Sequence, residues 1–307
     1  MRWSQAIAIN AVVIIGFGMV NPGGTLTEAQ IISDSTLPIN SDIKLEQNRL
    51  IIRGGTAVCS NLSHSFSEFN VEAGGGAYFT NPAGIENILS RVTGNNPSTI
   101  RGTLGVLDNA NLFLINPNGI LFDRNAQLNI NGSFIASTAN RLLFADGNEF
   151  STAPTQDSPL LTVSTPIGLG LVNNSAGIRI EGEGHQLKAL NFLPITGNSV
   201  AGLNVKFDRT LALIGGKIDL DSAILTALDG HIVLAAVNEG EVRFSSVQEE
   251  KFDFQNIGQF ANIALTTRSA INASGTTGGT IEMWGKEISL ADGSVSEGSQ
   301  YNQLNRF

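Results

Sequence analysis

The sequence holds a single cysteine, Cys59, among 307 residues, so no intrachain disulfide can form. Because free cysteines are usually buried, we expect the Cys59 thiol to be buried and inert. Charged residues are also scarce, at 15%, and the formal net charge is −9. No cluster of lysine and arginine is present to neutralise phosphates, so the composition argues against nucleic acid as a partner.

Signatures of catalysis, cofactors and metals are missing as well. The sequence contains no CxxC pair, no HExxH, no nonapeptide calcium repeat, no P-loop, no GxSxG and no dinucleotide-binding fingerprint. It therefore predicts no metal site and no cofactor, and it favours a protein that is not an enzyme.

Long apolar runs are absent except near the start. Arg2 precedes a run from Ala6 to Val20 with one polar side chain, and small residues follow up to Ala29. This pattern predicts a signal peptide over residues 1–29 with cleavage after Ala29. The run falls short of the ~20 residues of a comfortable membrane span, which disfavours the alternative of an uncleaved anchor.

Glycine and asparagine turns separate short runs of Ile, Leu, Val and Phe along the remaining chain, and Gly accounts for 34 residues. Short strands between tight corners are typical of a parallel β-helix, whose inward apolar residues stack from coil to coil. We therefore predict an all-β solenoid. The one segment with helical spacing of its apolar residues is Ile85 to Val92, where we expect a short helix.

The chain is organised around the stretch from Asn109 to Phe122, which reads N-A-N-L-F-L-I-N-P-N-G-I-L-F. Leu112 to Ile115 predicts a strand. The following N-P-N-G predicts a tight turn, because Pro fixes φ and Asn and Gly accept left-handed conformations. Ile120 to Phe122 predicts a second strand.

These motifs resemble the paired motifs of the two-partner-secretion domain of filamentous haemagglutinin-like exoproteins. Ala110 stands where that family more often has proline. The flanking segments at His64 to Val71, Asn87 to Gly94 and Asn131 to Asn140 agree with it too. The resemblance marks as secretion-motif residues Asn109, Asn111, Leu112, Asn116, Pro117, Asn118, Gly119 and Ile120. Their role is left open between a structural corner and recognition by a transporter.

The resemblance implies a right-handed, single-stranded parallel β-helix with an N-terminal cap. It also implies export through the periplasm of a Gram-negative type envelope, a partner that is an outer-membrane β-barrel with POTRA domains, and membrane contact only during export. The exported protein would be an adhesin, secreted or at the cell surface, with a carbohydrate or protein receptor on a host cell or surface. We place the secretion domain at residues 30–175.

Residues 176–307 carry irregular repeats in which a glycine precedes a strand. Examples begin at Gly216, Gly230 and Gly279. They predict further β-helix coils with variable spacing. These coils would belong to a short exoprotein or to a truncated, non-functional remnant of a longer one.

One alternative is a secreted β-helix lyase or hydrolase that acts on polysaccharide. Asp219 and Asp221 lie two apart on a predicted strand and so face one side, and His231 follows nearby in sequence. Since Lys217 is the sole basic residue that we place beside them, we favour solvated aspartates on the outer face. His64 is expected to be structural, and His185 to be solvated in an exposed turn.

Overall fold

The computed structural model describes residues 31–153, 164–186, 202–244 and 251–298, and the backbone of 300–305. Within these ranges every regular element is a β-strand. The predicted signal peptide and the predicted cleavage site after Ala29 lie outside the described residues.

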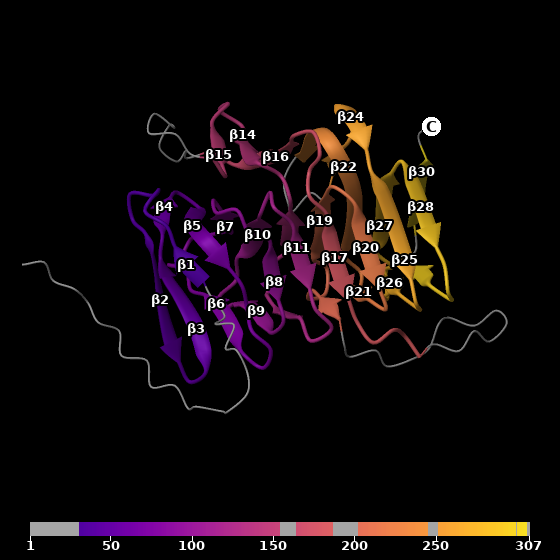
Figure 1. Ribbon diagram of the computed structural model, residues 1–307, viewed down its shortest axis with the longest axis horizontal. Helices are drawn as coiled ribbons and strands as arrows, with labels where there is room; N and C mark the ends of the chain where they lie inside the picture. The colour runs from indigo at the N-terminus through magenta and orange to yellow at the C-terminus, as the bar shows by residue number, and fades with distance from the viewer. Residues whose placement is uncertain (1–30, 154–163, 187–201, 245–250, 299, 306–307) are drawn as a thin grey trace, which may run out of the picture.

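The chain winds through three faces of parallel strands (Figure 1), with one strand on each face in every described coil except the first and the last. The first face holds β5 (Asn61–Phe69), β7 (Asn87–Val92), β10 (Asn111–Ile115), β13 (Phe134–Ser137), β19 (Thr210–Gly215), β22 (His231–Phe244), β27 (Thr280–Gly285) and β30 (Gln300–Asn305). The second holds β8 (Ser98–Ile100), β11 (Ile120–Phe122), β17 (Ile178–Glu181), β20 (Ile218–Asp221), β25 (Asn262–Thr266) and β28 (Glu287–Leu290).

The third face consists of two sheets. One holds β3 (Arg49–Gly54), β6 (Gly76–Phe79), β9 (Thr103–Val106) and β12 (Gln127–Asn129), and the other holds β18 (Leu203–Asn204), β21 (Ile224–Thr226), β26 (Ala270–Asn272) and β29 (Val295–Glu297). Successive strands such as β10, β11, β12 and β13 visit the three faces in turn. This arrangement confirms the predicted parallel β-helix.

Inward side chains stack in register along the solenoid. The column that begins the first face consists of Leu62, Ile88, Leu112, Phe134, Leu211, Ile232 and Ile281, each no more than 1% exposed. The repeats at Gly230 and Gly279 are neighbours in this face, whereas the repeat at Gly216 runs into the second face. Burying one such side chain contributes about 1.5–3 kcal/mol.

The N-terminal end is closed by antiparallel strands, as the resemblance implies. β1 (Ile31–Ser33) and β4 (Thr56–Val58) pair with β5, and β2 (Ser41–Glu46) pairs with β3. The β2–β3 hairpin turns at Gln47 and Asn48, whose φ angles of 46° and 65° suit a two-residue hairpin turn. These strands form the cap.

A second layer of antiparallel strands covers the outside of the first face. It contains β14 (Arg141–Phe144), β15 (Glu149–Ser151), β16 (Pro166–Leu171), the C-terminal half of β22, β23 (Phe252–Asp253) and β24 (Ile257–Phe260). Of these, β14, β15, β16 and β24 are labelled at the top of Figure 1. Outward residues such as Phe113, Ile115 and Val233 join its core. Strands of the first face are therefore buried on both sides, which explains the unbroken apolar run in β10.

The helix predicted at Ile85 to Val92 is wrong, because residues 87–92 form strand β7. Ile88 and Val92 enter the core of the solenoid, while Leu89 faces the second layer. A strand buried on both faces shows no polar alternation, and its apolar positions matched helical spacing by coincidence.

Candidate functional site

The N-P-N-G corner is a structural joint built around the buried side chain of Asn116. Its Nδ2 donates to the carbonyl of Asn96 and to Ser98 Oγ, both at 3.0 Å, and its Oδ1 accepts from the backbone N–H of Asn118 at 2.9 Å. The side chain is fully buried. Both ends of the amide are therefore satisfied, as burial of a polar group requires.

The rest of the corner reaches back to the preceding coil. Asn118 Nδ2 donates to the carbonyl of Gly94 at 2.7 Å, and the Gly119 N–H closes the turn on the carbonyl of Asn116 at 3.2 Å. Gly119 has a φ of 116°, a conformation that side chains with a Cβ rarely adopt. Each of these residue types has a structural reason to be present.

The other half of the motif belongs to a ladder of asparagines along the first face. Asn111 Nδ2 donates to Asn87 Oδ1 at 3.0 Å, Asn87 Nδ2 donates to Asn61 Oδ1 at 3.2 Å, and Asn61 Nδ2 donates to the carbonyl of Ser164. At the other end, Asn111 Oδ1 accepts from the backbone N–H of Ser133 at 2.9 Å. Asn61 and Asn87 were not singled out from sequence, although each begins a strand in the same way as Asn111.

This polar column continues beyond the asparagines. The N–H of Thr210 donates to Ser133 Oγ at 3.0 Å, and Thr210 stands in register with His231 on the next coil. Ser133, Thr210 and His231 are all nearly fully buried. One row of buried polar side chains therefore lies where the chain enters the first face in successive coils.

The predicted motif residues are brought together around β10 and the start of β11, yet few of them reach the surface. Leu112, Asn116, Gly119 and Ile120 are buried, Asn111, Pro117 and Asn118 are half-buried, and Asn109 is exposed. In the folded protein the motif is thus mainly an internal feature.

A second polar cluster, missed from sequence, surrounds the buried side chain of Arg91. Its Nε donates to Ser65 Oγ and its Nη2 to Thr36 Oγ1, both at 2.9 Å, and its Nη1 donates to the carbonyl of Ser151. The guanidinium also lies over the ring of Phe150, 4.1 Å from its centroid. Asn87 to Gly94 was noted as a motif flank, and an arginine among apolar residues was the available signal.

Asp34 completes the Arg91 cluster from the cap. Its carboxylate accepts from Thr36, from Ser65 Oγ at 2.7 Å and from Thr93 Oγ1 at 2.5 Å. Burial by itself would raise the pKa of Asp34, but these hydrogen bonds lower it overall. Burial lowers the pKa of Arg91 to about 10, partly offset by Asp34, so the guanidinium is charged at neutral pH.

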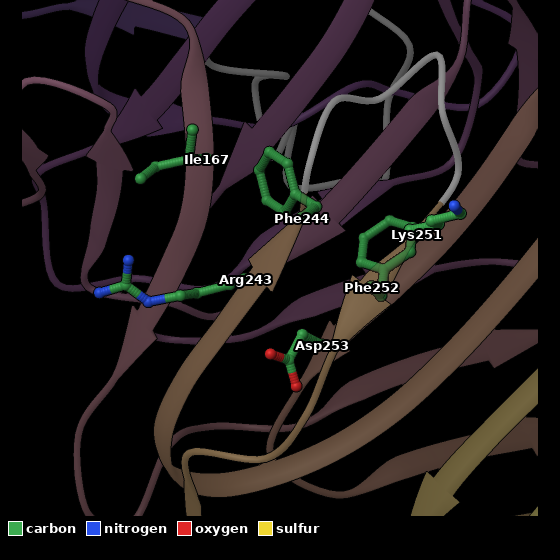
Figure 2. Close-up of a pocket in the computed structure, with 6 residues that line it drawn as sticks. All are labelled: Ile167, Arg243, Phe244, Lys251, Phe252 and Asp253. Carbon is green, nitrogen blue, oxygen red and sulfur yellow. The ribbon is translucent and has the colours of Figure 1, made fainter.

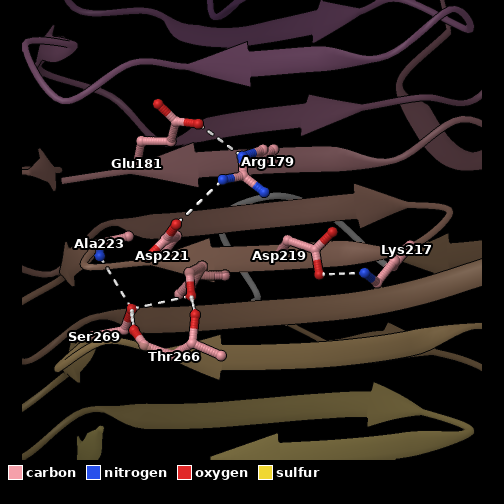
Figure 3. A network of polar contacts seen from close by, with 9 residues as sticks. Arg179, Glu181, Lys217, Asp219, Asp221, Ala223, Thr266 and Ser269 are labelled. Carbon is pink, nitrogen blue, oxygen red and sulfur yellow. Dashed lines mark hydrogen bonds and ion pairs between the residues drawn. The ribbon is translucent and has the colours of Figure 1, made fainter. Parts of the chain in front are cut away.

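Asp219, Asp221 and His231 do not converge. The two aspartates face outward from β20, where Asp219 pairs with Lys217 at 2.8 Å and Asp221 with Arg179 at 3.2 Å, as Figure 3 shows. His231 lies buried on β22 in another sheet, 3.2 Å from Glu282 Oε1. The expectation that Lys217 has no basic companion is wrong, because Arg179 comes from the neighbouring coil.

Two further side-chain predictions are corrected. Cys59 is exposed, because it occupies the turn between β4 and β5 with a φ of 51°. His185 is buried rather than solvated, and its Nε2 lies 2.8 Å from the carbonyl of Gly293, which follows β28, three strands beyond β17 in the second face. His64 has the structural place expected for it, fully buried with Nδ1 2.9 Å from Ser41 Oγ. Burial lowers the pKa of His64 to about 3, so the ring is neutral.

A pocket of about 390 Å³ opens in the second layer beside Phe244 and Phe252, whose rings lie 5.7 Å apart (Figure 2). Arg243 and Asp253 face each other across the strand pair, on the side opposite to the two rings. The Arg243 guanidinium donates to Glu241. The lining of the pocket therefore combines the two rings and Ile167 with three charged residues, Arg243, Lys251 and Asp253.

Across the described ranges, no three His, Cys, Asp or Glu side chains gather closely enough to hold a metal ion. The same ranges contain no helix long and apolar enough to cross a membrane.

The family model of the TPS secretion domain matches residues 29–283, most of the chain. The chain belongs to this family. Two solved secretion domains share the fold of this TPS domain. The HMW1 secretion domain from Haemophilus influenzae superposes with a TM-score of 0.54 at 20% identity, over 88% of this chain and 66% of the other. The filamentous hemagglutinin secretion domain gives 0.52 at 14% identity, over 87% and 99%.

A curated relative of the TPS domain is the heme/hemopexin-binding protein of Haemophilus influenzae, 27% identical over 177 residues. The match covers 55% of this chain and 18% of that protein, so the chain spans less than a fifth of its relative. The TPS family match continues past residue 175, where we divided the chain. That division stays a prediction.

Proposed function

We propose that this TPS domain is the part of an exoprotein that an outer-membrane β-barrel transporter with POTRA domains recognises and exports. The family match supports this proposal. The product would leave through the periplasm and act outside the cell, released or at the surface, as an adhesin. The family of haemagglutinin-like proteins supports the adhesive role, and no described residue identifies a receptor.

The observation that shapes the mechanism is the complete burial of Asn116. A side chain that is buried with both ends hydrogen-bonded offers nothing to a docked partner. The transporter therefore recognises the motif in a chain that is still extended. POTRA domains present sheet edges, and an extended segment binds such an edge by adding a strand. After the chain has passed the membrane, the corner stabilises the folded coil outside and so hinders its return through the transporter.

An export assay tests this proposal. The full chain is co-expressed with a candidate transporter, and the medium is assayed by antibody for Asn116→Ala/Asn118→Ala and for Asn109→Ala. We expect the double variant to be retained in the periplasm, because its coil does not lock. Asn109 is exposed and lies outside the corner, so Asn109→Ala leaves the locked coil intact and should be exported as the parent chain is.

Two other results would count against the proposal. Normal export of the double variant would show that the corner is not needed. If the parent chain were absent from the medium with every plausible transporter, export by such a transporter would be contradicted. Binding of the exported chain to cells then tests adhesion separately.

A further inference from the structure

The Arg91 cluster joins three parts of the fold that are distant in sequence. Thr36 lies in the cap, Ser65 and Arg91 lie on the first two coils, and Phe150 and Ser151 lie in β15 of the second layer. Arg91 as a residue is 4% exposed, and Asp34, also in the cap, accepts a hydrogen bond from Ser65 beside it. No other charged side chain among the described residues is as deeply buried as Arg91.

A buried cation with part of its partners missing is unfavourable, because water can no longer solvate it. Arg91 has three hydrogen-bond acceptors and one aromatic face: Thr36 comes from the cap, Ser65 from β5, and the Ser151 carbonyl and the Phe150 ring from the second layer. Neither part alone satisfies the guanidinium. The buried guanidinium of Arg91 is therefore fully stabilised only when the cap and the second layer are both in place.

We propose that Arg91 is a latch that couples closure of the N-terminal cap to docking of the β14–β15 hairpin. The cap is then firmly closed only when the chain is available as far as Ser151. This inference rests on the proposed function for its consequence: during export, the cap stays open until the chain has crossed as far as Ser151. The pKa of Arg91, about 10, leaves the latch charged throughout the neutral range.

Hydrogen exchange on the purified, folded full chain tests the coupling without any transporter, so its result is independent of the export assay. Phe150→Ala removes the aromatic face from the hairpin side. We expect amides of residues 31–36 to exchange roughly tenfold faster, although the substitution lies far along the chain. Thr36→Val, made in the cap, should in return accelerate exchange in β14 and β15, because coupling is reciprocal.

Two controls separate the latch from general loosening. Phe254→Ala empties a buried site elsewhere in the second layer and should leave residues 31–36 unchanged. In an Arg91→Met background, Phe150→Ala should no longer affect the cap, because the charged link is gone. The proposal is overturned if Phe150→Ala accelerates exchange in the hairpin alone, or if the coupling persists in the Met background.

Discussion

At the scale of single residues, buried amides determine how the motif contributes. The side chain of Asn116 forms hydrogen bonds with three groups: the Asn96 carbonyl and the Ser98 hydroxyl on the preceding coil, and the backbone N–H of Asn118 on its own coil. We predict that Asn116→Ala lowers the free energy of unfolding by about 1–3 kcal/mol, the cost of leaving such groups unpaired. Urea titration measures the change. Asn109→Ala is the matched control, and an equal loss there would contradict the explanation.

His64 makes stability depend on pH. Its pKa is about 3 in the folded chain and ordinarily about 6.5, so the unfolded chain binds the proton more readily. The contribution of His64 to the free energy of unfolding is therefore fully present above pH 6.5. It falls as the pH drops toward 3, by about 1.4 kcal/mol per pH unit within that window.

The pH dependence is checked by urea titrations between pH 7 and 5 on the parent chain and on His64→Phe. The variant should lose most of the slope in this range. Asp34, whose pKa is lowered, loses its stabilising contribution only at more acidic pH, so it does not interfere. An unchanged slope in the variant would show that other groups cause it.

At the scale of elements, the second layer makes outward positions of the first face as important as inward ones. Phe113 points out of β10 and is fully buried, whereas Leu121 points out of β11 on the uncovered second face and is half-buried. We predict a loss of about 3–5 kcal/mol for Phe113→Ala. Leu121→Ala should cost much less. Similar losses, measured by thermal or urea unfolding, would contradict a covering role for the layer.

The sequence predicted the coils well but not what covers them. The strands around N-P-N-G were confirmed at β10 and β11, because Asn, Pro and Gly specify a corner locally. The second layer was not predicted, because β14 and β15 are joined to the sheet through β16, which pairs with β22, far along the chain. The partners of Arg91 are likewise fixed by tertiary contacts, so its burial could not be read from the neighbouring residues. Which motif residues matter for export stays a prediction.

At the scale of the whole molecule, stacking crosses the predicted boundary at residue 175. β11 pairs with β17, and β13 pairs with β19, whose residues lie 77 positions away along the chain. We predict that residues 30–175 alone unfold at a lower temperature than the full chain, since β11 and β13 would lose a neighbour. Calorimetry measures this. Equal melting temperatures would support residues 30–175 as an independent domain.

The row of polar side chains at the entry of the first face has a consequence for how the solenoid grows. From β5 to β19, each new coil brings an Asn, Ser or Thr to this one position, where the previous coil offers a matching amide or hydroxyl. A strand shifted by one residue would place a leucine or phenylalanine against that group instead, and every following side chain would face the wrong way. The row therefore favours the correct register of each strand as it pairs with the previous coil. A register error destabilises the coil in which it occurs and is not passed on to the next coil.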